Sequence, residues 1–303
     1  MRVMCVHAHF DDYEFTCAGT FELLKRRHGD ALRARVVVCT DGAAGHHFRT
    51  RAETAAMRLR EQEESARRGG YEFRQLRYPD GSIPREACLA VSTPLLAALW
   101  REIRDFAPDY LFCPPVAAGP LAGIHVDHET VGQAVRRVAY MVNVPHAFTP
   151  EYPADETRSQ RCPVPVIINA YDHYLKGDLR HDLAVDIDAA FDRVAELSYC
   201  HRSQIEEWLP WVSSPIPFVA PTDLADWSRL LRARLLGHLG RSGLPAERVF
   251  ELFCVTSWGA VPTTARLLAD LPGVDAAASN LEALRRRLGE RHPTDATGQV
   301  RRP

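Results

Sequence analysis

Short apolar runs rich in β-branched residues recur along the first two thirds of the chain and predict buried strands. Continuous apolar runs of this length are typical of strands covered on both faces by other elements. Between them lie amphipathic stretches with apolar positions at helical spacing. The expected strands are residues 2–9, 34–40, 72–78, 110–114 and 164–170, and the expected helices are residues 19–27, 51–68, 94–106 and 127–141.

This alternation of strands and helices predicts the fold class. It favours an α/β fold with a Rossmann-like, mostly parallel sheet and helices on both of its faces. Ligands bind such sheets beyond the carboxyl ends of the strands. Residues that directly follow a predicted strand are therefore the first candidates for a functional site.

The pattern changes after residue 145 and suggests how the chain is divided. Residues 145–165 hold five prolines and predict a long surface loop. A helix is expected around residues 188–208 and a linker at 210–221. We therefore expect an α/β domain at residues 1–212, a helical C-terminal extension at 213–290 and a flexible tail at 291–303.

Composition and charge narrow the class of protein. The chain is 46% hydrophobic and 25% charged, as globular proteins are. With 37 Lys and Arg against 39 Asp and Glu, the net charge of -2 offers no basic surface for nucleic acid. The sequence contains neither a long apolar run nor a recognisable leader, so we expect a cytoplasmic protein without a membrane partner.

A histidine and several carboxylates follow the first predicted strand, in the segment His9-Phe10-Asp11-Asp12-Tyr13-Glu14. Adjacent carboxylates raise each other's pKa, and a bound divalent cation relieves that penalty. The cluster therefore favours a metal site at this edge of the sheet. The alternative is that Asp11 or Asp12 only caps the helix that follows.

A second polar segment, Gly123-Ile124-His125-Val126-Asp127-His128, follows the fourth predicted strand and opens a helix. His125 and His128 are three residues apart, so they share one helix face. These side chains could supply a metal ligand, a second imidazole for proton transfer or oxyanion stabilisation, and a carboxylate that fixes the tautomer of a histidine. The alternative is a capping turn in which Asp127 binds backbone amides and both histidines face water.

Together the two segments resemble the LmbE/PIG-L family of zinc-dependent de-N-acetylases, whose hallmark is (A)HPDDE followed by a later HxDH. Phe10 stands here in place of the usual Pro, and Tyr13 in place of the usual first Glu. The resemblance covers roughly residues 2–210. Its further matches are Thr40-Asp41-Gly42 with Gly45, Arg58-x-x-Glu61, Tyr78-Pro79-Asp80-Gly81 and His201-Arg202-Ser203-Gln204.

The resemblance implies a zinc ion, or another divalent metal, held by His9, Asp12 and His128. Three protein ligands leave one position of a tetrahedral ion open, as catalysis requires. Asp11 would then be the general base.

The resemblance also implies roles for the second segment and for substrate binding. His125 would stabilise the oxyanion as an imidazolium that Asp127 orients. Arg58 and Asp80 would bind the substrate. The alternative for Arg58 is an ion pair with Glu61 on a solvated helix face, and the alternative for Asp80 is a structural role in a turn.

These implications describe a hydrolase that cleaves a linear amide bond and removes an N-acyl group, above all an acetyl group. The group would be removed from an amino sugar or from a glycosylated small metabolite, such as those of secondary metabolism. The binding partner would be that small molecule. The sequence leaves open whether the chain also forms a homo-oligomer. One alternative is an amidase acting on a thiol conjugate or an antibiotic intermediate. Another is a non-catalytic sugar-binding homologue, although such a module needs no general base. A nucleotide-binding protein is disfavoured because no GxGxxG follows the first strand.

Overall fold

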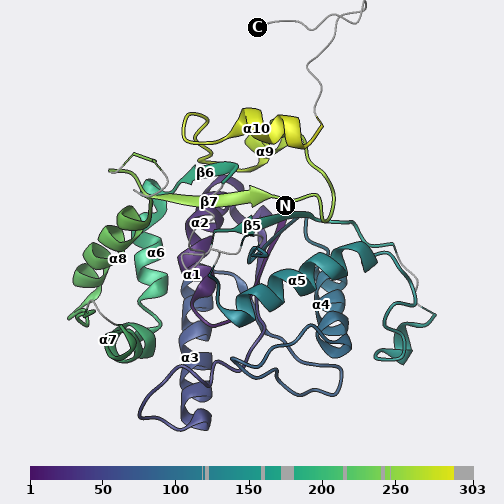
Figure 1. Cartoon of the computed structure of the whole chain (residues 1–303), viewed down its shortest axis with the longest axis horizontal. Coiled ribbons are helices and arrows are strands. Elements are labelled where there is room, and N and C mark those ends of the chain that lie inside the picture. The colour runs from purple at the N-terminus through teal and green to yellow at the C-terminus, as the bar shows by residue number, and fades with distance from the viewer. Residues whose placement is uncertain are drawn as a thin grey trace, which may run out of the picture.

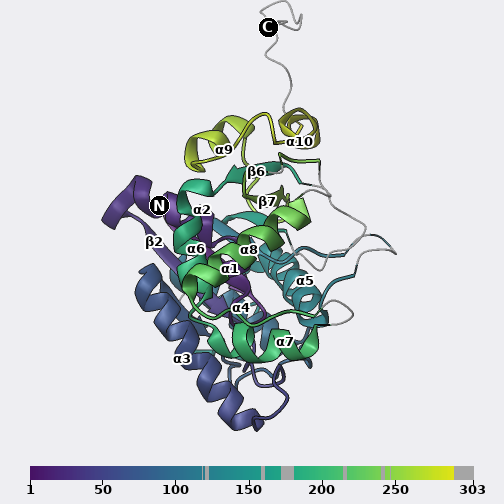
Figure 2. The same ribbon diagram turned by 90° about the vertical axis from the view of Figure 1, so that its left-hand side faces the viewer.

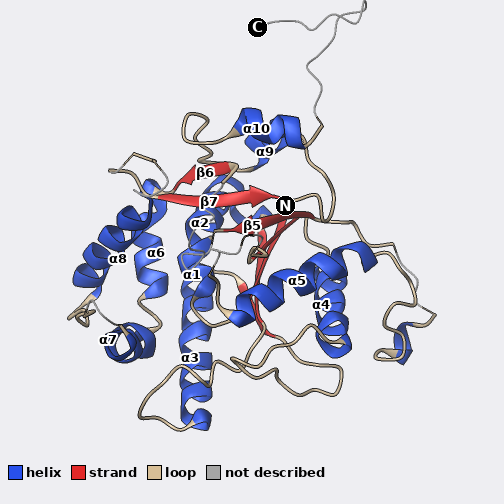
Figure 3. Cartoon of the chain, in the orientation of Figure 1, coloured by secondary structure: helices blue, strands red, loops and turns tan. Residues whose placement is uncertain are grey.

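The computed structural model confirms the α/β architecture. Seven strands in the described part of the chain form one sheet in the order β3-β2-β1-β4-β5-β7-β6, with helices on both faces (Figures 1 and 3). The predicted tail at 291–303 lies outside the described residues. These are residues 1–117, 119, 123–157, 161–171, 181–213, 217–239, 243–245 and 247–289.

Five parallel strands correspond to the predicted apolar runs. β1 lies inside the sheet, between β2 and β4. Its side chains alternate between the two faces, so that Val3 and Cys5 pack in one core cluster while Met4 and Val6 pack in the other. Both faces of β1 are covered, which is why its residues from Val3 to Val6 are all apolar. The bounds are β1 (Arg2–His7), β2 (Arg33–Val38), β3 (Glu72–Gln75), β4 (Tyr110–Cys113) and β5 (Val166–Ala170).

Helices form a layer on each face of the sheet. One core cluster unites α1 (Asp12–Thr16), α2 (Ala18–His28), α3 (Arg51–Gly69), α6 (Phe191–Ser198) and α8 (Leu224–Leu239), the side seen in Figure 2. The other unites α4 (Thr93–Phe106) and α5 (Val126–Met141). The start of α3 shows why these segments are helical, because Thr50 and Glu53 form a capping box there.

The segment expected to be a helical extension differs from that expectation. α8, α9 (Thr264–Asp270) and α10 (Leu281–Arg287) are helices, but β7 (Phe250–Val255) is a strand. β7 lies between β5 and β6 (Leu183–Asp186) and is antiparallel to both. A six-residue apolar run cannot be assigned to helix or strand by periodicity alone. The C-terminal part of the chain therefore completes the sheet.

The helix expected at residues 188–208 is broken into shorter pieces. After α6 the chain forms a π-helical segment, η4 (Ser203–Trp208), which leads into α7 (Leu209–Val212). Short 3-10 turns occur at η1 (Gly29–Ala31), η2 (Pro153–Asp155) and η3 (Asp188–Ala190). None of the helices in the described residues has both the length and the apolar character needed to cross a membrane.

Candidate active site

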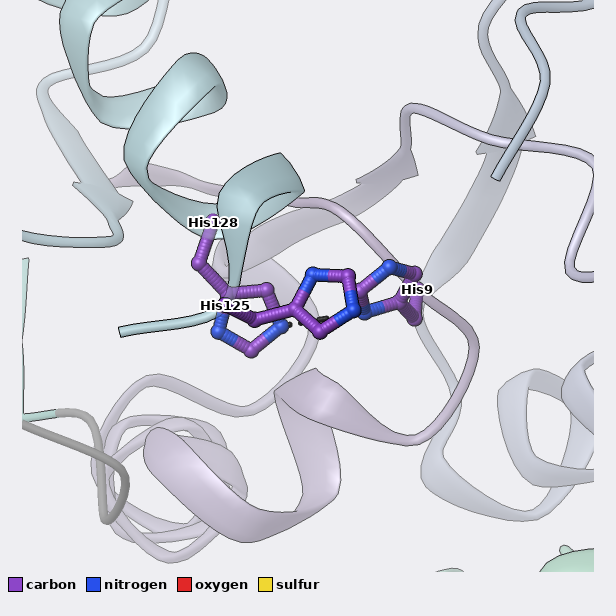
Figure 4. A group of neighbouring side chains, drawn as sticks. All are labelled: His9, His125 and His128. Atoms are coloured by element: carbon purple, nitrogen blue, oxygen red, sulfur yellow. Dashed lines mark hydrogen bonds between the residues drawn. The ribbon is translucent and has the colours of Figure 1, made fainter. Parts of the chain in front are cut away.

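The two polar segments meet at the carboxyl edge of the sheet. β1 leads into His9, and α5, which follows β4, begins beside His125 and His128. Nδ1 of His9 lies 3.0 Å from Nε2 of His128, and the rings of His9 and His125 are 4.5 Å apart. Figure 4 shows the three imidazoles gathered together. Residues about 115 positions apart in the chain thus share one site, as expected for neighbouring parallel strands.

Asp12 completes a triangle of donor atoms with two of these histidines. Its Oδ2 lies 3.2 Å from Nε2 of His128 and 3.4 Å from Nδ1 of His9. Ligand atoms about 2.0–2.1 Å from a tetrahedral zinc ion stand roughly 3.3–3.4 Å from one another. The 3.0 Å spacing of the two histidine nitrogens is slightly shorter. The donor set and its spacing therefore fit one small divalent cation.

The electrostatics of this triangle point the same way. Burial alone would raise the pKa of Asp12, but the imidazoles of His128, His7 and His9 hold it well below its usual value. Burial alone would lower the pKa of His9, yet its contacts with Asp12 and Asp127 raise it to about 9. The carboxylates thus attract positive charge to this point. A divalent cation would supply that charge in place of protons.

His7 also contributes to the site. Its side chain is buried, and its Nδ1 lies 2.5 Å from Oδ2 of Asp12. His7, Asp12 and His128 also have donor atoms within 4.8 Å of one another. The signal in the sequence was its two-residue separation from His9, which places both side chains on one side of a strand.

Asp11 faces the same cleft from an unusual backbone conformation. Its φ is 85°, in the left-handed region that Asp tolerates better than most residues. It precedes α1 but forms no side-chain cap, so the capping alternative is not observed. Instead Oδ2 of Asp11 lies 3.2 Å from Nη2 of Arg58. Burial raises the pKa of Asp11 despite this cation, which makes the carboxylate a better proton acceptor.

His125 and Asp127 are oriented differently from our expectation. The carboxylate of Asp127 contacts Nε2 of His9 at 3.0 Å and accepts the backbone N–H groups of Ala87 and Leu89. His125 is held by the backbone N–H of Asp127, which donates to its Nδ1 at 3.1 Å. Burial and the neighbouring His9 lower the pKa of His125. A neutral imidazole is therefore favoured over the expected imidazolium.

The two residues predicted to bind substrate lie in different surroundings. Arg58 is buried, lines the cleft and donates to the backbone carbonyl of Phe10. Its contact with Glu61 is longer, at 3.7 Å, than its contact with Asp11. Asp80 is exposed, is not among the residues that line the cleft, and accepts hydrogen bonds from Ser82. These bonds are those of a turn residue.

The two departures from the family hallmark are accommodated by packing. Phe10 is buried against Gly42, where an added Cβ would lie 2.3 Å from the Phe10 ring. Tyr13 is buried among aromatic rings of the core. Glu14, which directly follows it, is fully buried and accepts hydrogen bonds from α3 side chains. The loop therefore keeps its acidic residues at the cleft without the usual Pro.

The three candidate metal ligands and Asp11 line a cleft of about 310 Å³. Clefts of this size hold small organic ligands. The contributions of α8 were not predicted, nor were those of Glu86 and Ala87, which lie in the same loop between β3 and α4 as Asp80. Besides His9, Asp11, Asp12, Arg58, His125 and His128, the lining comprises Phe15, Thr16, Ala44, Gly45, Glu86, Ala87, Gln204, Trp208, Leu209, Leu231, Arg234 and Leu235.

Comparison with known proteins supports the resemblance found in the sequence. Residues 4–139 match the family model described as PIG-L, GlcNAc-PI de-N-acetylase. No curated protein sequence matches the chain.

Three solved structures share the fold. N,N'-diacetylchitobiose deacetylase from Pyrococcus horikoshii aligns with a TM-score of 0.62 and 22% identity over 85% of this chain and 84% of that one. The conserved protein TT1542 from Thermus thermophilus gives 0.56 and 18% over 84% and 93%. GalB, the 4-carboxy-2-hydroxymuconate hydratase of Pseudomonas putida, gives 0.55 and 15% over 83% and 94%. A deacetylase and a hydratase thus share this fold, so activity must be argued from the site.

Proposed function

We propose that the chain, whose residues 4–139 match the PIG-L family model, is a metal-dependent N-deacylase. Its substrate would be an amino sugar or a glycosylated small metabolite that carries an N-acyl group, above all an N-acetyl group. One observation carries the proposal. Donor atoms of His9, Asp12 and His128 stand 3.0 to 3.4 Å apart in a cleft that also contains the carboxylate of Asp11.

The cation, above all zinc, would be held by His9, Asp12 and His128. When bound, such a cation supplies a Lewis acid that polarises the amide carbonyl and acidifies water. His7 and Asp127 would keep the ligands oriented, through their contacts with Asp12 and His9 respectively.

Asp11 would act as the general base in this reaction. It removes a proton from the attacking water, and Arg58 keeps its carboxylate directed into the cleft. The C–N bond of the amide then breaks, and the proton passes to the departing amine. Water and amide are thereby converted into a carboxylate and an amine, with no further reactant.

His125 would stabilise the negative charge that develops on the carbonyl oxygen. Because its Nδ1 accepts the N–H of Asp127, its Nε2 carries the proton and can donate. A donor of this kind acts mainly in the transition state.

The proposal is tested by metal content and amine release measured together. We expect the purified protein to contain about one divalent metal per chain and to release amine from at least one member of a panel of N-acetylated sugars and glycosylated metabolites. A chelator should remove both properties, and zinc should restore them. His9→Ala should lose the metal, whereas His146→Ala, at an exposed histidine, should keep it.

Two results would contradict this function. Full metal occupancy in His9→Ala would show that the ligand set is wrong. A metal-loaded wild type that binds sugars yet releases no amine from any N-acyl substrate would favour the non-catalytic alternative.

A further inference from the structure

Four stacked or tilted rings extend from the cleft to the protein surface. Trp208 lines the cleft, and its ring centroid is 5.1 Å from that of Trp211. Trp211 is parallel to His47 at 4.9 Å, and His47 is stacked on His46 at 5.4 Å. Phe48 packs edge-on against both histidines, at 4.5 and 4.7 Å. We call these five residues the aromatic row.

Ionic contacts hold the two segments of the aromatic row together. Glu207, on η4, pairs with Arg49 at 2.5 Å and with Nε2 of His46 at 2.8 Å. Burial would raise the pKa of Glu207, but these two partners keep it below its usual value. Gln204 also donates to the carbonyl of Gly45 at 3.3 Å. The loop after β2 and the η4–α7 segment thus form one preorganised wall.

Core packing does not account for the outer members of the row. Trp227 is fully buried in the core, as a structural tryptophan is, but Trp211 is 58% exposed and Phe48 is 61% exposed. Clustered exposed aromatic side chains beside a cleft are typical of a binding surface. Trp208 also lies in a π-helical segment, a rare conformation that is found frequently at functional sites.

Polar groups accompany the rings at the point where the row enters the cleft. A Cβ on Gly45 would lie 3.7 Å from Nε1 of Trp208 and 3.6 Å from Oε1 of Glu86. Gln204 contacts the same glycine. An aromatic face bordered by carboxylate and amide groups matches a sugar ring, which offers an apolar C–H face and hydroxyl groups at its edge. A lipid chain would instead require a continuous apolar groove.

We propose that the aromatic row is a distal subsite that binds a second pyranose ring, covalently linked to the N-acylated unit, with Trp208 as its stacking platform. This inference rests on the proposed function, which assigns the N-acyl group to the metal end of the cleft. The preferred substrates are then N-acylated oligosaccharides or glycosides rather than free amino sugars.

The test compares substrates that differ only beyond the reacting unit. Amine release by the zinc-loaded full chain is measured with N-acetylglucosamine, its β-1,4-linked disaccharide and its octyl glycoside. The wild type should have the highest kcat/KM for the disaccharide. Trp208→Ala should lower the ratio of disaccharide to monosaccharide kcat/KM about tenfold, an ordinary value for one aromatic contact, and Trp208→Phe should restore most of it.

Tyr140→Ala is the matched control, since Tyr140 is 87% exposed and lies about 18 Å along α5 from His128. It should leave the ratio unchanged. A preference for the octyl glycoside, or equal losses with both sugars in Trp208→Ala at wild-type thermal stability, would overturn the subsite while leaving the deacylase function intact.

A binding measurement separates the subsite from catalysis. Calorimetric titration of the zinc-loaded chain with glucosamine and with its β-1,4-linked dimer needs no turnover. Tighter binding of the dimer that is lost in Trp208→Ala supports the subsite even if no amine is ever released. Equal affinity for the two sugars contradicts it.

Discussion

Asp11 and Arg58 form a contact that the spacing of residues in the sequence does not reveal. The three-residue interval offered an ion pair with Glu61 as the alternative to substrate binding by Arg58, but the guanidinium lies closer to Asp11, at 3.2 Å. Asp11 makes that contact from a left-handed backbone conformation, with φ of 85°. The adjacent carboxylates were identifiable as a site from their chemistry. Their different partners depend on folding, because Arg58 and Gln62 of α3 must first reach the loop that follows β1.

Asp11→Asn is expected to retain the metal but to lose about 10²–10⁴ in kcat, the contribution of a positioned general base. Asn is a suitable replacement because it accepts the left-handed conformation as well as Asp does. Metal stoichiometry and kcat are measured on the same preparation.

Asp30→Asn, at an exposed position, serves as the control and should change neither quantity. Loss of metal from Asp11→Asn would make Asp11 a ligand. A kcat near that of the wild type would require a different base.

His125 and Asp127 show a second limit at the residue scale. The sequence correctly indicated that this segment opens a helix at the site, and His125 is indeed the residue before α5. It could not indicate that Asp127 would contact His9 and two backbone amides around residue 88. Those partners come from distant loops, so the tautomer of His125 followed only from the structure.

At the scale of elements, hydrophobic periodicity predicted the parallel strands but not β7. The parallel strands alternate with helices, and that context resolved their ambiguity. β7 has no such context, and its sequence Phe-Glu-Leu-Phe-Cys-Val carries a charged residue. Glu251 is buried because its carboxylate accepts the backbone N–H groups of Gly19 and Thr20 and the hydroxyl of Thr20. The start of α2 thus explains an acidic residue inside the sheet.

Glu251→Gln should destabilise the fold by about 1–3 kcal/mol. The amide has the same shape, but its NH₂ group cannot accept a hydrogen bond, so at least one buried donor at the start of α2 loses its partner. The free energy of unfolding in urea measures this loss.

Glu63→Gln is the matched control, at an exposed position on α3, and should change that free energy by less than about 0.5 kcal/mol. Equal stability of Glu251→Gln and the wild type would mean that the Glu251 contacts do not contribute.

At the scale of the whole molecule, one sheet contains strands from both the N-terminal and the C-terminal parts of the chain. β7 comes from the segment expected to be a separate extension, yet it supplies the hydrogen-bonding partner of both β5 and β6. α8 from the same segment contributes Leu231, Arg234 and Leu235 to the cleft. The division at residue 212 was inferred from prolines and a change in periodicity, which are local signals. Strand pairing between distant segments leaves no such local signal.

A chain ending at residue 212 is therefore expected not to fold cooperatively. It would lack Trp227, Leu231, Phe250, Leu252 and Phe253, all of them 4% exposed or less. At about 1.5–3 kcal/mol for each buried side chain, the loss is roughly 8–15 kcal/mol, as large as the whole stability of a typical domain, about 5–15 kcal/mol. β6 would also lose its pairing with β7.

Thermal unfolding of this fragment, followed by circular dichroism, should then show no sharp transition, and metal should not bind stoichiometrically. A chain ending at residue 289, which keeps every described residue, should unfold as the full chain does. A cooperative, metal-binding 1–212 fragment would instead establish residues 1–212 as an independent domain.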